Sequence, residues 1–257
     1  MLGAIGGDVI GSVYERRNTK KMDFPLFGKY SRFTDDTVLT IAIAEAILHE
    51  TEYTKSLKNF GRKFPDAGYG ESFSKWIFET TNKPYNSYGN GSAMRVSPIG
   101  FAFSRAEEVL LEAKKSAEVS HNHPEGIKGA QATALAIFLA RTGVNKESIR
   151  EEIGGRFGYD LNRTVDDIRP SYKFDVSCQG SVPEAIIAFL DSENYEDSIR
   201  KSISLGGDSD TIACITGGIS QAFYKIIPPE LVCDIRLRLP QEFLDIIDGF
   251  NAKYIDH

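Results

Sequence analysis

The sequence predicts an all-α fold. Apolar residues recur at the three- and four-residue spacing of a helix through most of the chain. Only residues 172–176 alternate as a strand would, and that run is brief. The composition, 257 residues with 41% apolar and 26% charged, is that of a globular protein. A chain of this length buries about 70–75% of its unfolded-state surface, so its core needs no disulfide or metal.

The spacing predicts helices at 2–15, 37–49, 72–79, 105–119, 127–141, 182–190, 209–226 and 240–249. Segments 38–44 and 130–140 are apolar nearly all round, which indicates central helices surrounded by others. Turn-forming residues gather at 81–92, 154–171 and 228–229. We identify no low-complexity linker and no internal repeat in the sequence, so we expect one domain over residues 1–257.

Charge and cysteine content exclude several classes of protein. The net charge is -6, with 30 Lys and Arg against 36 Asp and Glu, so general binding of nucleic acid is not expected. The sequence has three cysteines, far apart from one another: Cys178, Cys214 and Cys233. Their odd number and wide spacing favour a protein of the reducing cytoplasm over a secreted protein with a disulfide framework. No apolar run reaches about 18 residues, so no membrane span is expected. A monomer is the default expectation.

Two clusters of acidic residues each stand directly before an apolar helix. The first is Thr34-Asp35-Asp36-Thr37, and the second is Asp208-Ser209-Asp210-Thr211 after two glycines. Helix capping explains one or two of these side chains, but not all of them. Several carboxylates brought together inside a protein require a compensating cation. If the two helix starts meet, their carboxylates and threonines form an oxygen-only site that selects Mg²⁺, Mn²⁺ or Ca²⁺ over Zn²⁺, with enough charge for two ions.

The first helix is rich in glycine. Gly3, Gly6, Gly7 and Gly11 each cost a helix about 1 kcal/mol relative to alanine, which indicates close helix packing or a ligand near the backbone. The four-residue spacing places Glu15 on the same helix face as Gly11. From spacing alone, Glu15 is best interpreted as a surface residue.

Two further segments carry polar residues at helix starts. Gly89-Asn90-Gly91 before a helix suits either an anion-binding backbone or an ordinary turn. His121 and His123 precede Pro124, which marks the first turn of a helix. The sequence shows no further Cys or His at zinc-site spacing, so we interpret these histidines as helix-start residues that could contact a ligand.

Taken together and in this order, these motifs resemble the ADP-ribosylglycohydrolase family, also called the ADP-ribosyl-acceptor hydrolase or dinitrogenase reductase-activating glycohydrolase family. The resemblance runs over residues 3–225 and includes Gly89–Arg95 and His123-Pro124 with Gly126. It implies a compact, orthogonal all-α bundle with two Mg²⁺ ions, replaceable by Mn²⁺, in a central cleft.

The resemblance also implies roles for individual residues. The positions that match metal ligands are Thr34, Asp35, Asp36, Asp208, Asp210 and Thr211. The positions that match the substrate-binding loop and a substrate-contacting histidine are Gly89, Asn90, Gly91, Ser92, Met94 and His123. Glu15 matches an acid/base position and, with Asp36 and Asp210, is expected to be catalytic. Asp8 is expected to play a supporting role.

The implied reaction is hydrolysis of the N- or O-glycosidic bond between ADP-ribose and an acceptor, with release of free ADP-ribose. The acceptor stays open: arginine, serine, an acetyl ester, a nucleic-acid end or a small metabolite would each fit. Tyr172 and Phe174 are candidates to stack on adenine, with core packing as the alternative.

Two other functions compete. A Mg²⁺-dependent phosphohydrolase of the haloacid-dehalogenase type would need a hydrophobic strand before its first Asp, and residues 204–207 do not form one. An inactive family member that only binds ADP-ribose would have no reason to keep closely spaced acids.

Overall fold

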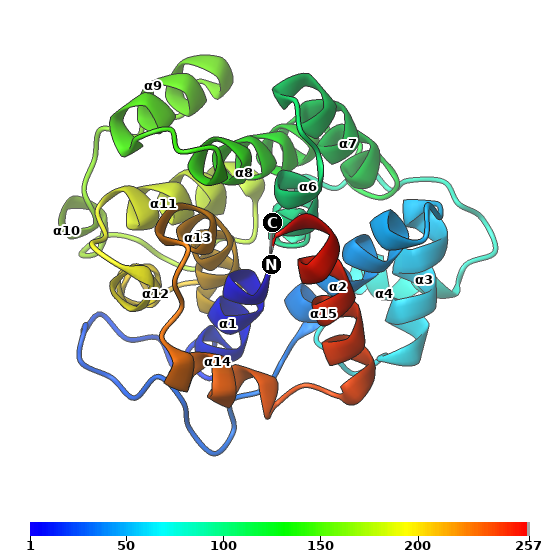
Figure 1. Cartoon of the computed structure of the whole chain (residues 1–257), viewed down its shortest axis with the longest axis horizontal. Coiled ribbons are helices and arrows are strands. Elements are labelled where there is room, and N and C mark those ends of the chain that lie inside the picture. Colours follow the sequence, from blue (N-terminus) through cyan, green and yellow to red (C-terminus); the bar gives the residue numbers. More distant parts are fainter. Residues whose placement is uncertain (256–257) are drawn as a thin grey trace.

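The computed structural model describes residues 1–255, which form helices joined by loops (Figure 1). Over this range the only bridge between extended segments is an isolated antiparallel one, from Gly89 to Ser177. The helices are α1 (Leu2–Gly11), α2 (Asp35–Leu48), α3 (Tyr53–Lys63), α4 (Glu71–Phe78), α5 (Gly91–Met94), α6 (Ser97–Ala102), α7 (Ala106–Glu118), α8 (Pro124–Arg141), α9 (Lys146–Phe157), α10 (Val165–Ile168), α11 (Cys178–Leu190), α12 (Tyr195–Ser204), α13 (Ser209–Tyr224), α14 (Pro229–Arg236) and α15 (Gln241–Tyr254). The predicted all-α class is confirmed.

Every helix expected from the sequence is present, with shifted ends. The first ends at Gly11, not at residue 15, so Glu15 lies in the turn that follows α1. The second begins at Asp35 because the Thr34 side chain accepts a hydrogen bond from the Asp36 amide and caps it. The helix expected at 182–190 begins at Cys178, where Ser177 is the cap.

The sequence pattern did not predict the more polar helices, among them α3, α9, α12 and α14. Each buries only a narrow apolar stripe, such as Leu57 and Phe60 in α3 or Ile199 and Ile203 in α12. Such helices are stabilised by packing on the core rather than by their own composition. Residues 172–176 are not a strand but a loop that leads into α11.

Helix α1 packs at very short distance against α13, beside it in Figure 1. Gly3, Gly7 and Gly11 share one face of α1. A Cβ atom on Gly7 would lie 2.0 Å from the Ala213 carbonyl oxygen, and one on Gly11 would lie 2.6 Å from the Cα atom of Asp210. Of the two interpretations of the glycines, close helix packing is therefore confirmed. This contact brings the two acid-bearing regions of the chain together.

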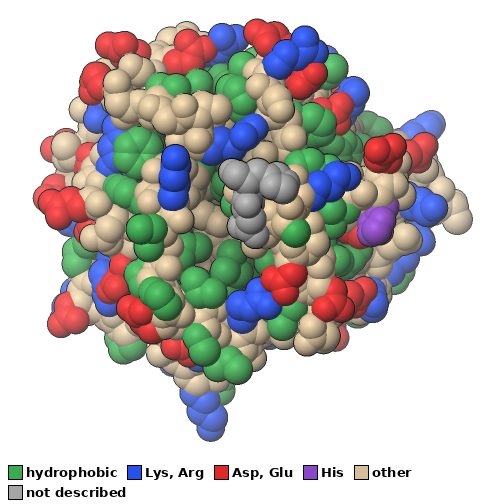
Figure 2. Space-filling view, in the orientation of Figure 1, with side chains coloured by type: hydrophobic (Ala, Val, Ile, Leu, Met, Phe, Trp, Pro, Cys, Tyr) green, Lys and Arg blue, Asp and Glu red, His purple; other side chains and the backbone are tan. Residues whose placement is uncertain are grey.

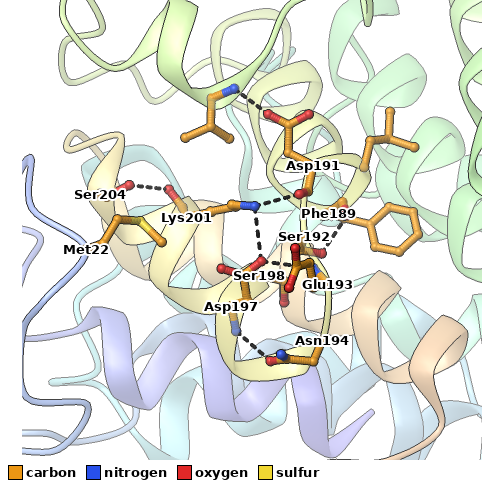
Figure 3. Close-up of polar contacts among 12 residues, drawn as sticks. Met22, Phe189, Asp191, Ser192, Glu193, Asn194, Asp197, Ser198, Lys201 and Ser204 are labelled. Atoms are coloured by element: carbon orange, nitrogen blue, oxygen red, sulfur yellow. Dashed lines mark hydrogen bonds and ion pairs between the residues drawn. The ribbon is translucent and has the colours of Figure 1, made fainter.

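Helix α12 leads the chain into the second acidic cluster. The Asn194 side chain caps its start by accepting from the Asp197 amide at 2.9 Å, and Lys201 Nζ donates to the Asp191 carbonyl at 2.6 Å (Figure 3). Beyond the helix, Gly206 and Gly207 have φ angles of 65° and 123°. These left-handed angles favour glycine, and they turn the chain sharply into α13.

The buried apolar side chains form one continuous core that draws on most of the helices. Central helices α2 and α8 bury nearly all faces, as their composition predicts. On the face seen in Figure 2, side chains of both charges surround scattered apolar patches. No helix between residues 1 and 255 combines the length and apolarity needed to cross a membrane.

Candidate active site

A cleft of about 630 Å³ opens where the starts of α2 and α13 meet. The six residues expected as metal ligands all line it: Thr34, Asp35, Asp36, Asp208, Asp210 and Thr211. The turn after α1, which carries Glu15, forms another wall. The segment of residues 85–95, which includes α5, also lines the cleft. The tertiary structure thus brings together clusters separated by more than 170 residues in the sequence.

The carboxylates lie close together at the bottom of the cleft. Oxygen atoms of Asp8, Asp36 and Asp210 lie within 4.8 Å of one another. Asp36 Oδ2 is near two threonine hydroxyls, 3.4 Å from Thr34 Oγ1 and 3.3 Å from Thr211 Oγ1. Asp36 Oδ1 is buried and has no hydrogen-bond partner among residues 1–255. A buried carboxylate oxygen without a partner is unfavourable, and this one is free to bind a ligand.

Burial and mutual repulsion raise the pKa of these acids. Burial, followed by the charge of Asp8, raises the pKa of Asp35 to about 8. Burial and neighbouring acids raise the pKa of Asp36 and Asp210 well above the ordinary carboxyl value. Burial also raises the pKa of Asp208, although a hydrogen bond from Asn90 opposes the rise. These shifts are the ones expected for buried carboxyl groups that lie next to other acids.

Asp8 links α1 to the start of α2. Its carboxylate accepts hydrogen bonds from the Thr34 amide at 2.9 Å, the Thr34 hydroxyl at 2.7 Å and the Thr37 amide at 3.1 Å, and a fourth from the Thr37 hydroxyl. It does not appear among the residues that line the cleft. Asp8 therefore orients Thr34 and the start of α2, in agreement with the supporting role expected for it.

Glu15 lines the cleft and is only partly exposed. Its amide donates to the Gly11 carbonyl at 3.2 Å, and its own carbonyl accepts from Asn18 Nδ2 at 2.8 Å. Its charge contributes to the raised pKa of Asp35, Asp208 and Asp210, so it lies within electrostatic reach of the cluster. The interpretation of Glu15 as a plain surface residue is therefore wrong.

The loop before α5 is joined directly to the acidic cluster. Asn90 Nδ2 donates to Asp208 Oδ2 at 2.7 Å and to Ser181 Oγ at 3.1 Å. Gly89, Asn90, Gly91 and Met94 line the cleft. Ser92, expected to bind substrate, instead points into the protein, where its hydroxyl donates to the Gly126 carbonyl at 2.7 Å. Asn90 thus holds an acid in place, and Ser92 anchors the loop to α8.

The structure places His121, not His123, in the cleft. His123 Nδ1 accepts from the Glu125 amide at 3.1 Å and caps α8. His121 is buried, and its Nε2 would lie 3.1 Å from a Cβ atom on Gly91. The sequence marked both histidines as candidates, and the structure separates them by burial, by cleft lining and by the capping hydrogen bond of His123. Of the aromatic candidates, Phe174 lines the cleft and is 53% exposed, whereas Tyr172 packs against Gly207.

Arg95 is a cleft residue that the sequence analysis did not single out as a site. Its side chain is fully buried, and its Nη2 donates to the Ser116 carbonyl at 2.8 Å and to Ser120 Oγ at 3.0 Å. Its Nε and Nη1 atoms have no hydrogen-bond partner in the part of the chain that the structure describes. Burial lowers its pKa to about 10. The sequence holds no signal for this role, because nothing local indicates that Arg95 is buried beside a cleft.

The whole chain matches a known family. A family model described as ADP-ribosylglycohydrolase covers residues 1–254. The chain belongs to the ADP-ribosylglycohydrolase family. The ADP-ribosylhydrolase ARH3 of Homo sapiens is 28% identical over 304 residues, which cover 87% of this chain and 84% of that protein. The ADP-ribosylarginine hydrolase Tri1 of Pseudomonas putida (strain GB-1) is 25% identical, covering 90% of this chain and 72% of the relative.

Among solved structures, the chain resembles one titled "ADP-ribosylglycohydrolase-related protein complex", with a TM-score of 0.74 and 21% identity over 98% of this chain and 96% of that one. At this identity the likeness shows the shared all-α fold. Family membership makes the protein an ADP-ribosylglycohydrolase, an enzyme that hydrolyses the glycosidic bond of ADP-ribose to an acceptor.

Proposed function

We propose that this cleft carries out the reaction with two bound divalent cations, Mg²⁺ or Mn²⁺, and releases free ADP-ribose. The observation that carries the proposal is the buried, unpartnered Asp36 Oδ1 within a group of acids. The charges that raise the pKa of Asp36 and Asp210 all come from other acids. A native protein keeps such a cluster when a cation neutralises it.

The donor atoms of the cleft fit these ions. They are carboxylate and hydroxyl oxygens, which Mg²⁺ and Mn²⁺ prefer. The residues that would hold the ions are Thr34, Asp35, Asp36, Asp208, Asp210 and Thr211. Asp8 lies near them, but its carboxylate already accepts four hydrogen bonds. When bound, the ions would orient ribose hydroxyls and polarise water.

Glu15 is the residue we assign to proton transfer. It stands at the wall of the cleft, close enough to Asp35 and Asp210 to act on their charge. In hydrolysis a water adds to the anomeric carbon, and the bond from that carbon to the acceptor breaks. The Glu15 carboxylate would accept the proton of the attacking water or, when protonated, donate it to the leaving acceptor.

The segment of residues 85–95 would bind the rest of ADP-ribose. Gly89 and Gly91 allow close approach of a diphosphate to the backbone. Arg95 places an unpaired positive charge behind this loop, and His121 lies beside Gly91. Phe174 offers an exposed ring on which adenine could stack. We further propose that the chain works as one monomeric domain in a reducing cytoplasm; its three free cysteines are consistent with that compartment.

The test is a panel of acceptors, each linked to ADP-ribose through arginine, serine, an acetyl ester or a nucleic-acid end. Free ADP-ribose, measured by mass spectrometry, should appear with Mg²⁺ and stop with EDTA. The Asp210→Asn variant is the control for a contaminating activity. Binding of ADP-ribose without turnover of any member would favour the inactive alternative. Release of phosphate from phosphomonoesters in its place would favour the phosphohydrolase, although a pair of glycines rather than a strand precedes Asp208.

A further inference from the structure

The long loop between α1 and α2 is strongly basic. Its residues 16–32 contain six Lys or Arg and one acid, a net charge of +5 in a chain whose net charge is -6. The remainder of the protein therefore carries -11. The loop extends beyond the helices at the lower edge of Figure 1, and Lys or Arg side chains form the lowest point of the surface in Figure 2.

Hydrogen bonds to three other segments hold this loop in place: the turn of residues 205–207, the loop that contains Tyr172, and helix α12. Asn18 Nδ2 donates a hydrogen bond to the Gly207 carbonyl at 3.0 Å, and Asn18 Oδ1 accepts one from the Gly207 amide at 2.8 Å. Lys20 Nζ donates to the carbonyls of Tyr172 and Leu205, and Arg200 donates to the Phe24 carbonyl at 2.8 Å. The positive charges are thus presented by an anchored backbone, which lowers the entropy lost when a partner binds.

All three arginines of the loop stand at the rim of the cleft. Arg16, Arg17 and Arg32 are exposed and line the opening. Within residues 1–255 their guanidinium groups have no ion-pair or hydrogen-bond partner, which leaves them available to bind a carboxylate. Arg16 and Arg17 directly follow Glu15, and Arg32 precedes Thr34 by two residues. They therefore border the part of the cleft next to Glu15, where the proposed proton transfer would release the acceptor.

We propose that this rim, with the exposed Lys21 and Lys29 on the same loop, docks an acidic segment of a protein acceptor next to its ADP-ribosylated residue. The proposal rests on the proposed function, because that function places the acceptor at the Glu15 end. Exposed guanidinium groups bind carboxylates through paired hydrogen bonds. A basic loop on an acidic protein also steers a negatively charged segment toward the cleft.

The size of the basic surface favours a peptide over a nucleic acid. A polyphosphate chain extending past the loop would meet a surface that is net negative, whereas a few Asp or Glu residues would stay within the loop. Single-strand binding also relies on several aromatic side chains for stacking. In residues 16–32 the one strongly exposed aromatic ring is Tyr30, and Lys29 lies over it.

The experiment compares two peptides with the same ADP-ribosylated residue, one flanked by Glu and one by Gln, in the presence of Mg²⁺. We expect the Glu peptide to have a kcat/KM about tenfold higher at low salt, and the preference to fade near 0.5 M salt as screening grows. Arg17→Gln/Arg32→Gln should bring the ratio close to one. Lys55→Gln/Lys253→Gln removes the same charge from exposed positions outside the cleft lining and should keep the wild-type ratio.

A second measurement separates this proposal from the function on which it rests. Binding of the unmodified Glu peptide, followed by fluorescence anisotropy, needs no turnover and should weaken about tenfold in the arginine variant. If neither peptide is hydrolysed but the Glu peptide still binds, and binds more weakly to the arginine variant, the proposed function is wrong and the docking proposal is supported. Equal kcat/KM for the two peptides, or tighter binding of a single-stranded oligonucleotide of equal charge, would overturn the docking proposal.

Discussion

Asp36 and Glu15 illustrate two different effects of burial on an acid. Asp36 is surrounded by other acids and keeps an oxygen without a partner, which prepares it for a cation. Glu15 lines the cleft and is partly exposed to solvent. The two carboxyl groups thus differ in solvent access and in neighbouring charge, which is why we propose different roles for them.

Glu15→Gln should lower kcat by about 10²–10⁴-fold while ADP-ribose affinity changes little, because size and hydrogen-bonding reach are kept and only proton transfer is lost. Turnover of an ADP-ribosylated acceptor and calorimetric titration with ADP-ribose provide the two measurements. Glu151→Gln, on the exposed face of α9, is the matched control. Near-normal turnover would mean that Glu15 takes no part in proton transfer.

Asp210→Asn should abolish activity and leave the fold intact, since the amide keeps the shape but loses the charge. Asp8→Asn should retain more activity but destabilise the protein by about 1–3 kcal/mol, because Asp8 accepts hydrogen bonds from Thr34 and Thr37. Activity and urea unfolding of both variants check this division. Equal loss of activity with unchanged metal affinity would contradict it.

At the scale of elements, the glycine face of α1 decides where the acids stand. Only residues without a Cβ atom allow α1 to approach the backbone of α13 so closely. The glycines lower the helix propensity of α1, and the packing they permit offsets that loss. The site therefore depends on a helix–helix distance as well as on its own side chains.

Gly11→Ala should lower both stability, by about 1–3 kcal/mol, and activity, because the new methyl group would meet the backbone of Ser209 and Asp210. Gly155→Ala in α9 is the matched control: no atom lies within 4 Å of its Cβ position, and the change should stabilise that helix by about 0.5–1 kcal/mol. Thermal melting and turnover measure both effects. A Gly11→Ala protein with normal turnover would show that the α1–α13 distance does not position the acids.

At the scale of the whole molecule, cation binding should stabilise the fold. A ligand at 100 times its Kd adds about 2.7 kcal/mol, which raises Tm by about 5–10 °C in a chain of this size. Differential scanning calorimetry with Mg²⁺, Mn²⁺ and EDTA measures the shift. Asp36→Asn/Asp210→Asn should melt at the same or a higher temperature without metal, because repulsion is relieved, and should lose the metal-induced rise. A Tm that does not respond to any of these cations would count against the metal site.

The sequence by itself determined the helical class, most of the apolar helices, both acidic clusters and, through its motifs, the family. These features are local, because helical periodicity, capping residues and short motifs can each be recognised within a short stretch of sequence. The sequence did not predict the polar helices α3 and α12, because these helices are stabilised by packing on the core rather than by their own composition.

Which residues share the cleft follows from the packing of distant helices and not from the sequence alone. In the structure Glu15, His121 and Arg95 line the cleft, whereas His123 caps α8 and the Ser92 hydroxyl points into the protein. The position of His123 directly before Pro124 fits a helix cap, but nothing in the sequence shows that His121 is buried at a cleft. Burial and electrostatic environment depend on segments remote in sequence, such as α13 against α1. They arise only when the chain has folded, because that is when distant charges come within range of one another.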